Sequence, residues 1–496
     1  MGLVIRQSFY STLISYIGVV IGYVNLLYLY PKFMQPEQVG LLRTIQDAAI
    51  LFTPFAQFGL AQTIVRYFPR MVNDQKSSGS FISLMLGLSV AGFAVFFILF
   101  KIFEVPLLSY FKSNASEILN YTSLILWLTL ILLLIAVLEA YSRSLLQTIF
   151  PNLLREIVAR LLLAVLIILY FQGYLTYHQF IIGTVVAYLF CLTILLLYLR
   201  WGGHLKLTTQ FKQLDSSKFP ELIQYSLLSF AGTAGLIIIG KVDSLMISGM
   251  IGLAANAVYT TAFYMATVIE VPKRALSQVA MPLIARAFEK NDMKDIATIY
   301  KKTSINQFII GTLLIIGVWI NLDSIFQLMP RNEVYEAGRS VVIIIGLGKL
   351  IDMLFGPSSE IIVLSKYYKF NIVLILSLAI VVVISNNLLI PLYGINGAAF
   401  GSALALILFN AAKCIFIYVK LKMQPFDLAT LKVLLIGTAA FGLNLLIPSQ
   451  TNLFFDAALR SVIITIFYGS LILFSNASPD ANSLLKRLMQ LLKRVQ

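Results

Sequence analysis

Residues 235–244 read GLIIIGKVDS, and this stretch can be interpreted either as a phosphate-binding loop or as part of an apolar helix. Its two glycines and its lysine satisfy the first positions of the phosphate-binding pattern G-x-x-x-x-G-K-[ST], but Val242 stands where a hydroxyl must hold Mg²⁺. Four large apolar residues lie between the glycines and favour burial over an open, polar loop. The stretch therefore predicts a lysine and an aspartate inside an apolar helix, and it argues against a nucleotide site.

The composition around this stretch extends the same conclusion to the whole chain. Of the 496 residues 59% are hydrophobic and 12% are charged, whereas a soluble domain carries about 25% charged residues. Apolar stretches of about 20 residues, long enough to cross a hydrocarbon core of about 30 Å, recur along the chain. We expect an all-α polytopic membrane protein with about fourteen transmembrane helices. The expected ranges are 9–30, 40–66, 79–103, 118–142, 153–171, 177–199, 222–249, 254–285, 303–328, 338–365, 370–390, 397–420, 429–448 and 459–475.

The net charge of +15 fits such a protein without nucleic acid as a partner. An even number of helices puts both termini on one side, and most of the 37 lysines and arginines then fall in loops on that side. Cytoplasmic loops of membrane proteins carry this excess, so we expect both termini in the cytoplasm. Residues 479–496 place leucines on one stripe of a helix and basic residues on the opposite side, which predicts a basic amphipathic helix on the anionic cytoplasmic leaflet; the alternative is a frayed tail.

Cysteine and histidine usage indicates neither a disulfide framework nor a metal centre. Cys191 and Cys414 lie inside apolar stretches, and His178 and His204 are isolated near loops. The first apolar stretch follows Arg6 and lacks a small-residue cleavage site, so we expect a retained helix instead of a signal peptide. The sequence predicts no cofactor, apart from a coupling cation, Na⁺ or H⁺.

A weak internal repeat suggests the domain organisation. Residues 38–45 and 64–74 can be set against 256–263 and 284–292, each pair ending in Asn-Asp. Internal duplication is common in transporters and predicts two six-helix lobes. The expected parts are an N-lobe at 1–200, a cytoplasmic loop at 201–221, a C-lobe at 222–425, two further helices at 426–478 and the tail at 479–496.

Several ionisable side chains fall at membrane depth, where they normally face a cavity or a partner. Arg43 and Asp47 are four residues apart, and Lys349 and Asp352 are three apart, so each pair can share a helix face. Glu139 and Glu270 lie at similar depth.

Lys241 and Asp243 are two residues apart, about 200° around a helix, and cannot pair directly. We interpret Lys241 as a cavity cation for a polyanion; the alternative is that it snorkels towards the outer interface. Arg66 and Arg286 end two helices at equivalent places in the repeat, either as topology anchors or as substrate cations.

Three stretches carry a resemblance to a known family: residues 30–70, residues 241–286, and LLIPLYGINGAAFGSALALI at 388–407. In the last, Pro391, Tyr393-Gly394 and Gly397-Ala398-Ala399 are similar to that family's entry into its twelfth helix. The chain resembles the polysaccharide flippase branch of the multidrug/oligosaccharidyl-lipid/polysaccharide exporter superfamily.

This resemblance implies a fold and an activity. Two six-helix bundles would surround a central cavity that opens alternately to each leaflet, with two extra helices. Members move isoprenoid-pyrophosphate-linked oligosaccharides from the cytoplasmic to the outer leaflet for surface polysaccharide assembly. We accordingly expect a bacterial cytoplasmic (inner) membrane protein, with lipid-linked oligosaccharide, membrane lipids, a polysaccharide polymerase and glycosyltransferases as partners. The expected substrate-binding cations are Lys241, Arg43, Lys349, Arg66 and Arg286.

The resemblance also implies an ion-coupling site. Some relatives hold Na⁺ between a helix-7 aspartate and an asparagine near the end of helix 11; Asp243 matches the first position, and Asn387 with Asn386 falls close to the second. Carboxylate and amide oxygens suit a hard cation. Alternatively, the two asparagines cap the outer end of their helix.

Two other functions remain open from the sequence. A cation-coupled drug antiporter of the same fold would need an acidic or aromatic cavity, whereas the groups at membrane depth include Lys241 and Lys349. A membrane glycosyltransferase or polymerase would need a sizeable outer loop with acid and base groups, and the acidic residues of the predicted outer loops are few and scattered. We therefore expect a transporter and not an enzyme.

Overall fold

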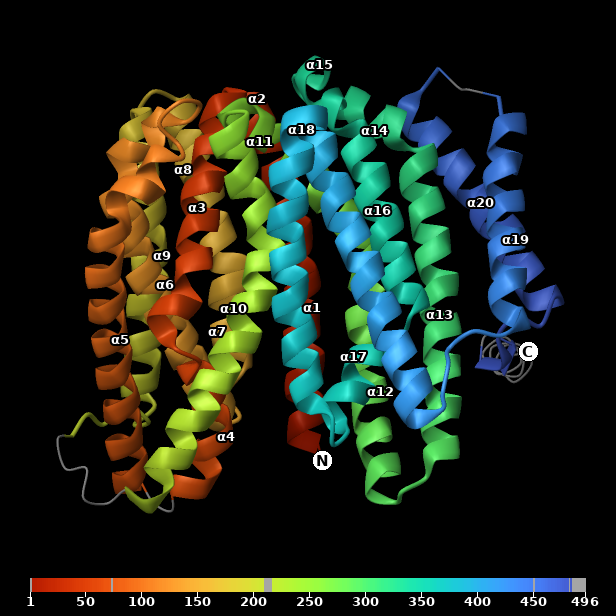
Figure 1. The fold of residues 1–496 in the computed structure, drawn as a ribbon. Coiled ribbons are helices and arrows are strands. Elements are labelled where there is room, and N and C mark those ends of the chain that lie inside the picture. The colour runs from red at the N-terminus through yellow and green to blue at the C-terminus, as the bar shows by residue number, and fades with distance from the viewer. Residues whose placement is uncertain (1, 73–74, 209–215, 449–450, 481, 484–496) are drawn as a thin grey trace, which may run out of the picture. The chain divides into compact units, whose positions relative to one another are not determined.

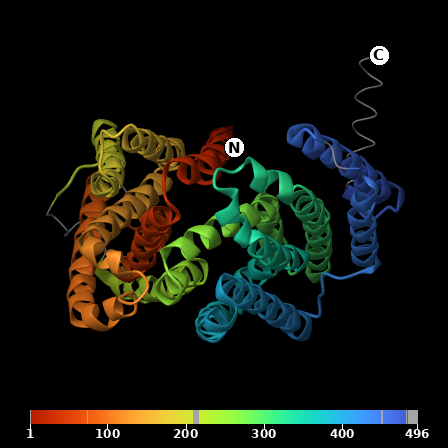
Figure 2. The same ribbon diagram turned by 90° about the horizontal axis from the view of Figure 1, so that it is seen from above.

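The computed structural model describes residues 2–72, 75–208, 216–448, 451–480 and 482–483, and every regular element in these ranges is a helix. The chain divides into two compact units, Met1–Val258 and Tyr259–Gln496, which are described one at a time. Figures 1 and 2 show most helices of each unit running alongside one another, in side view and from above. The predicted amphipathic tail at 479–496 falls mostly outside the described residues.

Unit 1 comprises the helices up to α10 and the start of α11 (Figure 1). Its elements are α1 (Gly2–Val24), the π-helix η1 (Asn25–Leu29), α2 (Tyr30–Phe33), α3 (Pro36–Gln57), α4 (Leu60–Met71), α5 (Gln75–Ser109), η2 (Ser116–Tyr121), α6 (Thr122–Ser144), α7 (Ile149–Leu153), the π-helix η3 (Leu154–Val158), α8 (Ala159–Phe171), α9 (Tyr177–Trp201), η5 (Ser216–Lys218), α10 (Phe219–Met250) and α11 (Leu253–Thr267).

A bend between α3 and α4 fixes how α10 packs in unit 1. The two helices meet at 44°, where Phe58 and Gly59 take left-handed conformations with φ of 49° and 76°. Ser226 of α10 donates a hydrogen bond to the Phe58 carbonyl at 2.6 Å. A Cβ at position 59 would lie 2.2 Å from the Ser226 carbonyl oxygen, so the bend needs glycine for space as well as for its φ.

The other end of α3 approaches α11 equally closely. A Cβ on Gly40 would lie only 1.8 Å from the carbonyl oxygen of Leu253, the first residue of α11. Glycine at position 40 therefore lets the two backbones touch, as small residues do in membrane helix contacts. One end of α3 therefore touches the start of α11, and the bend at position 59 contacts α10 at the other end.

Unit 2 holds the rest of α11 and the elements that follow it (Figure 1). These elements are η6 (Val268–Glu270), α12 (Val271–Glu289), α13 (Met293–Ile320), α14 (Leu322–Leu328), α15 (Asn332–Tyr335), η7 (Glu336–Gly338), α16 (Arg339–Leu354), α17 (Ser358–Leu364), α18 (Tyr368–Leu421), α19 (Leu428–Leu443), η8 (Asn444–Leu446) and α20 (Leu453–Phe474).

Helix α13 forms the centre of the apolar core of unit 2. Its side chains Phe308, Ile315 and Ile316 pack with Met353 of α16 and with residues of α19 and α20. The two helices predicted at 426–478 thus pack against α13. A second apolar cluster joins α12, the start of α13, α17 and the end of α18.

Helix α18 consists of two legs that meet at Gly394. This residue has φ of 60° and ψ of −139°, a conformation essentially restricted to glycine. A straight helix of 54 residues would extend about 80 Å, far more than a bilayer core of about 30 Å. The sequence predicted a break between residues 390 and 397, and the kink lies within that interval. Figure 1 shows the two legs descending separately from the kink.

The membrane-spanning character of the fold is confirmed. Among the described residues nine helices are long and apolar enough to cross a membrane, and two bent pairs, α3 with α4 and the segment 332–354 with α17, raise this number to eleven. Every predicted range falls on helical structure, which confirms the all-α polytopic class. To reach fourteen, the two legs of α18 must count as two spans, α7 and α8 together as one span, and α11 and α12 together as one span. The number fourteen therefore stays a prediction, and so do the lobe boundaries.

Candidate functional site

Lys241 and Asp47 form an ion pair between α10 and α3 in unit 1. Lys241 Nζ lies 2.5 Å from Asp47 Oδ1, and the side chains are 20% and 5% exposed. The sequence required Lys241 to find a partner beyond its own helix, and this partner is Asp47. The sequence had instead predicted Arg43 as the partner of Asp47. A charged lysine and a charged aspartate at this depth compensate each other.

Polar side chains continue along the α3 and α10 contact. Thr44 and Ser248 hydroxyls lie 2.7 Å apart, and the Asn256 amide donates to Thr44 at 3.0 Å. Arg43 also lies on α3. Its Nη1 donates to the Gln46 side-chain oxygen at 3.4 Å, and its guanidinium carbon lies 5.1 Å from the centre of the Tyr30 ring. The Lys241–Asp47 pair is thus continuous with a zone of hydroxyl and amide groups.

Unit 2 contains two ion pairs that connect η6 and α12 with α16. Lys349 Nζ lies 2.5 Å from Glu270 Oε2, and Lys273 donates to Asp352. Glu270 and Lys273 are three residues apart, and so are Lys349 and Asp352, but the acid and the base follow in opposite order. Each lysine therefore pairs with the carboxylate of the neighbouring segment. We call these two ion pairs the swapped pairs. The predicted pairing of Lys349 with Asp352 is wrong, because each forms its ion pair with an opposite charge across the helix contact.

A buried lysine extends the swapped pairs into α17 and α18. Asn410 donates to Asp352 at 2.9 Å. Lys413, one turn further along α18, is 2% exposed; its ammonium donates to the Ser359 hydroxyl at 2.9 Å and lies 4.2 Å from the centre of the Phe409 ring. The sequence assigned Lys413 to the cytoplasmic loop cations, but it lies within a helix and is buried.

The predicted cations at helix ends are exposed. Arg66 of α4 stacks over the Tyr225 ring, with 4.3 Å between its guanidinium carbon and the ring centre. Arg286 lies in the last turn of α12 with its side chain exposed. Both positions suit topology anchors as well as substrate cations, so their predicted role in binding stays a prediction.

The predicted coupling residues lie in different units. Asp243 is buried in α10 of unit 1 at 4% exposure. In unit 2, Asn386 is fully buried in α18, whereas its neighbour Asn387 is exposed. Among the described residues no group of three or more His, Cys, Asp or Glu side chains could hold a metal ion. The sodium site therefore stays a prediction.

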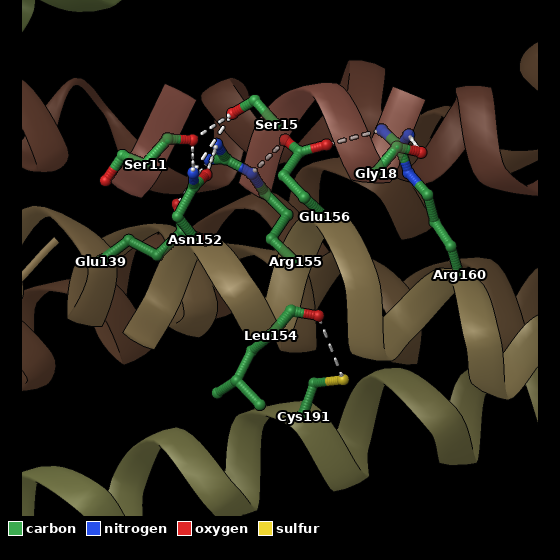
Figure 3. Close-up of polar contacts among 10 residues, drawn as sticks. All are labelled: Ser11, Ser15, Gly18, Glu139, Asn152, Leu154, Arg155, Glu156, Arg160 and Cys191. Carbon is green, nitrogen blue, oxygen red and sulfur yellow. Dashed lines mark hydrogen bonds and ion pairs between the residues drawn. The ribbon is translucent and has the colours of Figure 1, made fainter. Parts of the chain in front are cut away.

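A third charged cluster joins α6, η3, α8 and α1 in unit 1 (Figure 3). Arg155 Nη1 donates to Glu139 Oε2 at 2.9 Å, and its Nε donates to Glu156 Oε1 at 3.1 Å. The other oxygen of Glu156 accepts from Arg160 at 2.6 Å, and Arg160 also donates to the Gly18 carbonyl of α1. These bonds make one chain of charges from α6 to α1.

A strip of polar contacts attaches α1 to this cluster. The Asn152 amide donates to the Ser11 carbonyl at 2.9 Å and to the Ser15 hydroxyl at 3.2 Å (Figure 3). Gly18 and Gly22 leave room for the approach: a Cβ on Gly18 would lie 2.6 Å from the Glu156 carbonyl oxygen, and one on Gly22 would lie 2.7 Å from the Arg160 guanidinium. Small residues four apart permit this close approach.

Sequence reasoning missed the contacts of Lys273, Lys413 and Arg155 because all three were counted as loop cations. Lys413 lies well inside the apolar range 397–420, and Arg155 lies inside the predicted helix 153–171. Their positions within apolar ranges were the signal that could have found them.

The fold defines the chain as a polytopic α-helical membrane protein with charged side chains inside its spans. The profile of a family described as polysaccharide biosynthesis protein matches residues 4–288, more than half of the chain. The chain belongs to this family. It is also 22% identical over 404 residues to an uncharacterized membrane protein of Methanocaldococcus jannaschii, a match that covers 75% of each chain.

Solved structures of the same fold support this assignment. The lipid II flippase MurJ in an inward closed conformation has a TM-score of 0.76 at 14% identity, over 94% of this chain and 99% of that chain. An inward-facing multidrug resistance MATE family transporter of the MOP superfamily has a TM-score of 0.64 at 13% identity, over 84% and 94%. A MOP superfamily transporter from Pyrococcus furiosus has a TM-score of 0.55 at 12% identity, over 85% and 95%. At these identities the likeness shows the fold alone, and the family rests on the profile match.

Proposed function

We propose that this chain moves an isoprenoid-diphosphate-linked oligosaccharide from the cytoplasmic to the outer leaflet by alternating access, for surface polysaccharide assembly. Membership of a polysaccharide biosynthesis family and the fold of a lipid II flippase support this substrate class. The proposal includes no covalent chemistry: the substrate changes leaflet and no bond is made or broken.

The observation that carries the proposal is that lysines at membrane depth are held by carboxylates on neighbouring helices. Lys241 is paired with Asp47, and Lys349 with Glu270. A resident carboxylate compensates each ammonium while no substrate is bound. A diphosphate entering a site of low dielectric can compete for these lysines, because attraction between charges is much stronger there than in water.

The same pairs weigh against a drug antiporter. A cavity for cationic drugs needs carboxylates that are available to the drug, whereas Asp47, Glu270 and Asp352 are each bound by a lysine of the same unit. The drug antiporter is therefore the weaker interpretation of this fold.

The remaining elements of the proposal concern location and coupling. Both termini lie in the cytoplasm, as the distribution of basic residues predicts. The protein lies in the bacterial inner membrane, as the resemblance to the flippase family implies. A polymerase and glycosyltransferases act on the same lipid-linked oligosaccharide. Asp243 takes part in coupling to the cation, Na⁺ or H⁺, and the contribution of Asn386 or Asn387 stays a prediction.

Transport in reconstituted vesicles tests the proposal. A fluorescent isoprenoid-diphosphate-linked oligosaccharide is loaded inside, and its arrival outside is followed with an enzyme that cannot cross the membrane and that cleaves the sugar. We expect protein-dependent export and no movement of ethidium, a cationic probe. Movement of ethidium alone would favour the antiporter and refute the flippase. Imposed Na⁺ and H⁺ gradients, compared in wild type and Asp243→Asn, test the coupling site.

A further inference from the structure

The charged cluster of Figure 3 contains a guanidinium that is fixed in orientation yet still has donors to offer. Arg155 donates to Glu139, to Glu156 and, at 3.0 Å, to the Asn152 side-chain oxygen. A guanidinium has five N–H donors, so three bonds to described acceptors leave two for a further acceptor. A side chain held in this way loses little freedom when it binds a ligand.

The cluster presents its positive side outward. The Arg155 side chain is 55% exposed, whereas its carboxylate partners Glu139 and Glu156 are 13% and 16% exposed. Arg160 is 31% exposed, and Arg143, one turn after Glu139 on α6, is exposed. Three arginines therefore face two carboxylates, and an approaching group meets the arginines first.

The backbone at Arg155 is also unusual. Residues 154–158 form the π-helix η3, a widened turn of a kind that often occurs at functional sites. The widened turn contains both Arg155 and Glu156, and Arg155 bonds from it to Glu139 of α6. The Cys191 thiol of α9 lies 4.0 Å from the Leu154 carbonyl oxygen at the start of this turn.

We propose that Arg155, together with Arg143, binds the phosphate group of a lipid, and that this site is distinct from the Lys241–Asp47 pair. Planar guanidinium groups recognise phosphate through paired N–H donors. The phosphate can belong to the diphosphate-linked substrate or to an anionic phospholipid. The first case rests on the proposed function, and the second does not. Glu139, Glu156 and Asn152 orient Arg155 and do not contact the ligand.

Equilibrium binding to the full-length protein in nanodiscs of neutral lipid tests this site. The probe is radiolabelled farnesyl diphosphate, with farnesol as the phosphate-free control. We expect Arg155→Gln to weaken binding of farnesyl diphosphate about tenfold or more, as for loss of a charge-assisted hydrogen bond to phosphate. The matched control is Arg200→Gln at the exposed end of α9, which removes the same charge from the same unit and should change binding less than twofold.

The competitors distinguish the two sources of phosphate. Displacement of the probe by inorganic pyrophosphate and by phosphatidylglycerol alike identifies a general lipid-phosphate site, and displacement by pyrophosphate alone identifies a diphosphate site; both outcomes support the proposal. Equal weakening by Arg155→Gln and Arg200→Gln, or farnesol binding as tight as that of farnesyl diphosphate, overturns it.

A second variant covers the case in which Arg155→Gln does not fold. Arg155→Lys keeps the charge but loses the planar donor set, and we expect binding several-fold weaker than in wild type. Unchanged binding by Arg155→Lys overturns the role of the guanidinium. Vesicle transport is a separate readout: absence of oligosaccharide export by wild type refutes the proposed function, while the binding result decides this site.

Discussion

The two units solve the problem of charge at membrane depth in different ways. Unit 1 pairs Lys241 on α10 with Asp47 on α3. Unit 2 links four charges as swapped pairs between η6, α12 and α16, and then adds Asn410 and Lys413 from α18. The first arrangement is a single ion pair between two neighbouring helices. In the second, one carboxylate, Asp352, serves several donors.

This difference predicts how each site responds when charges are removed. A pair with one principal partnership can be replaced as a unit, because nothing charged is left behind when both members go. A carboxylate with several donors cannot, since removing it and one lysine still leaves other groups without an acceptor. Double-mutant cycles measure this distinction directly.

Loss of Asp352 should have the largest effect. Asp352→Ala leaves Lys273 and the Asn410 amide without their acceptor, and we expect a loss of about 4 kcal/mol in the free energy of unfolding. Adding Lys273→Met should recover only part of it, because one N–H of the Asn410 amide still lacks its acceptor while the other bonds to the Leu406 carbonyl. Denaturant unfolding of purified protein in detergent measures both variants. Full recovery in the double variant would mean that Asp352 serves Lys273 alone.

Loss of Lys241 should cost somewhat less stability, and most of the loss should be recoverable. Lys241→Met leaves the buried Asp47 uncompensated, at an expected cost of about 3 kcal/mol. The double variant Lys241→Met, Asp47→Asn should unfold close to wild type in the same assay.

Transport by these variants separates folding from substrate binding. Neither the single nor the double variant should export lipid-linked oligosaccharide, because both lack the cation, and Lys241→Arg should retain part of the activity. Normal export by the stable double variant would remove Lys241 from the binding site.

A smaller effect is expected from the close helix contact that positions the unit 1 pair. Gly40→Ala places a methyl group where the Leu253 carbonyl oxygen lies, so α3 and α11 must separate, at a cost of about 1–3 kcal/mol. Gly87→Ala on α5 is the matched control, because a Cβ there meets nothing within 4 Å. We expect the control to be neutral or slightly stabilising. Equal thermal unfolding midpoints for the two variants would contradict the tight contact.

The smallest effect is expected at Lys413, although it is the most buried of these lysines. Its ammonium bonds to a hydroxyl and faces an aromatic ring, so Lys413→Met should change stability by less than about 1 kcal/mol. Lys273→Met, the matched variant in the same unit, should cost clearly more because Lys273 is paired with Asp352. A thermal unfolding series of the two variants checks the order, and the reverse order would contradict it.

The helices could be predicted from sequence because each span needs an unbroken apolar stretch of fixed length. The break in α18 was also visible, since Pro391 and Gly394 interrupt two long apolar stretches. Both features depend on residues that are neighbours in the chain, so one sequence suffices to find them.

The choice of ion-pair partners could not be predicted in the same way. Spacing along one helix favoured Lys349 with Asp352, but Lys349 bonds to Glu270, 79 residues away. Two parallel helices with acid and base in opposite order can satisfy all four charges across their contact, and only the packing decides between the two arrangements. Spacing showed that Lys241 and Asp243 cannot pair; it could not identify Asp47 as the partner of Lys241.

The polar strip on α1 has a consequence for how the chain is made. Helix α1 leaves the ribosome long before residues 149–171, so it must wait in the bilayer without the partners of Figure 3. Helix α1 contributes only uncharged polar groups to these hydrogen bonds: the Ser15 hydroxyl and the carbonyls of Ser11 and Gly18. The costly charges are carried by the later segment, where Glu156 and Arg160 already neutralise each other one turn apart. In the contact between α1 and residues 149–171, the order of synthesis therefore never requires α1 to carry a charge into the membrane ahead of a counter-ion.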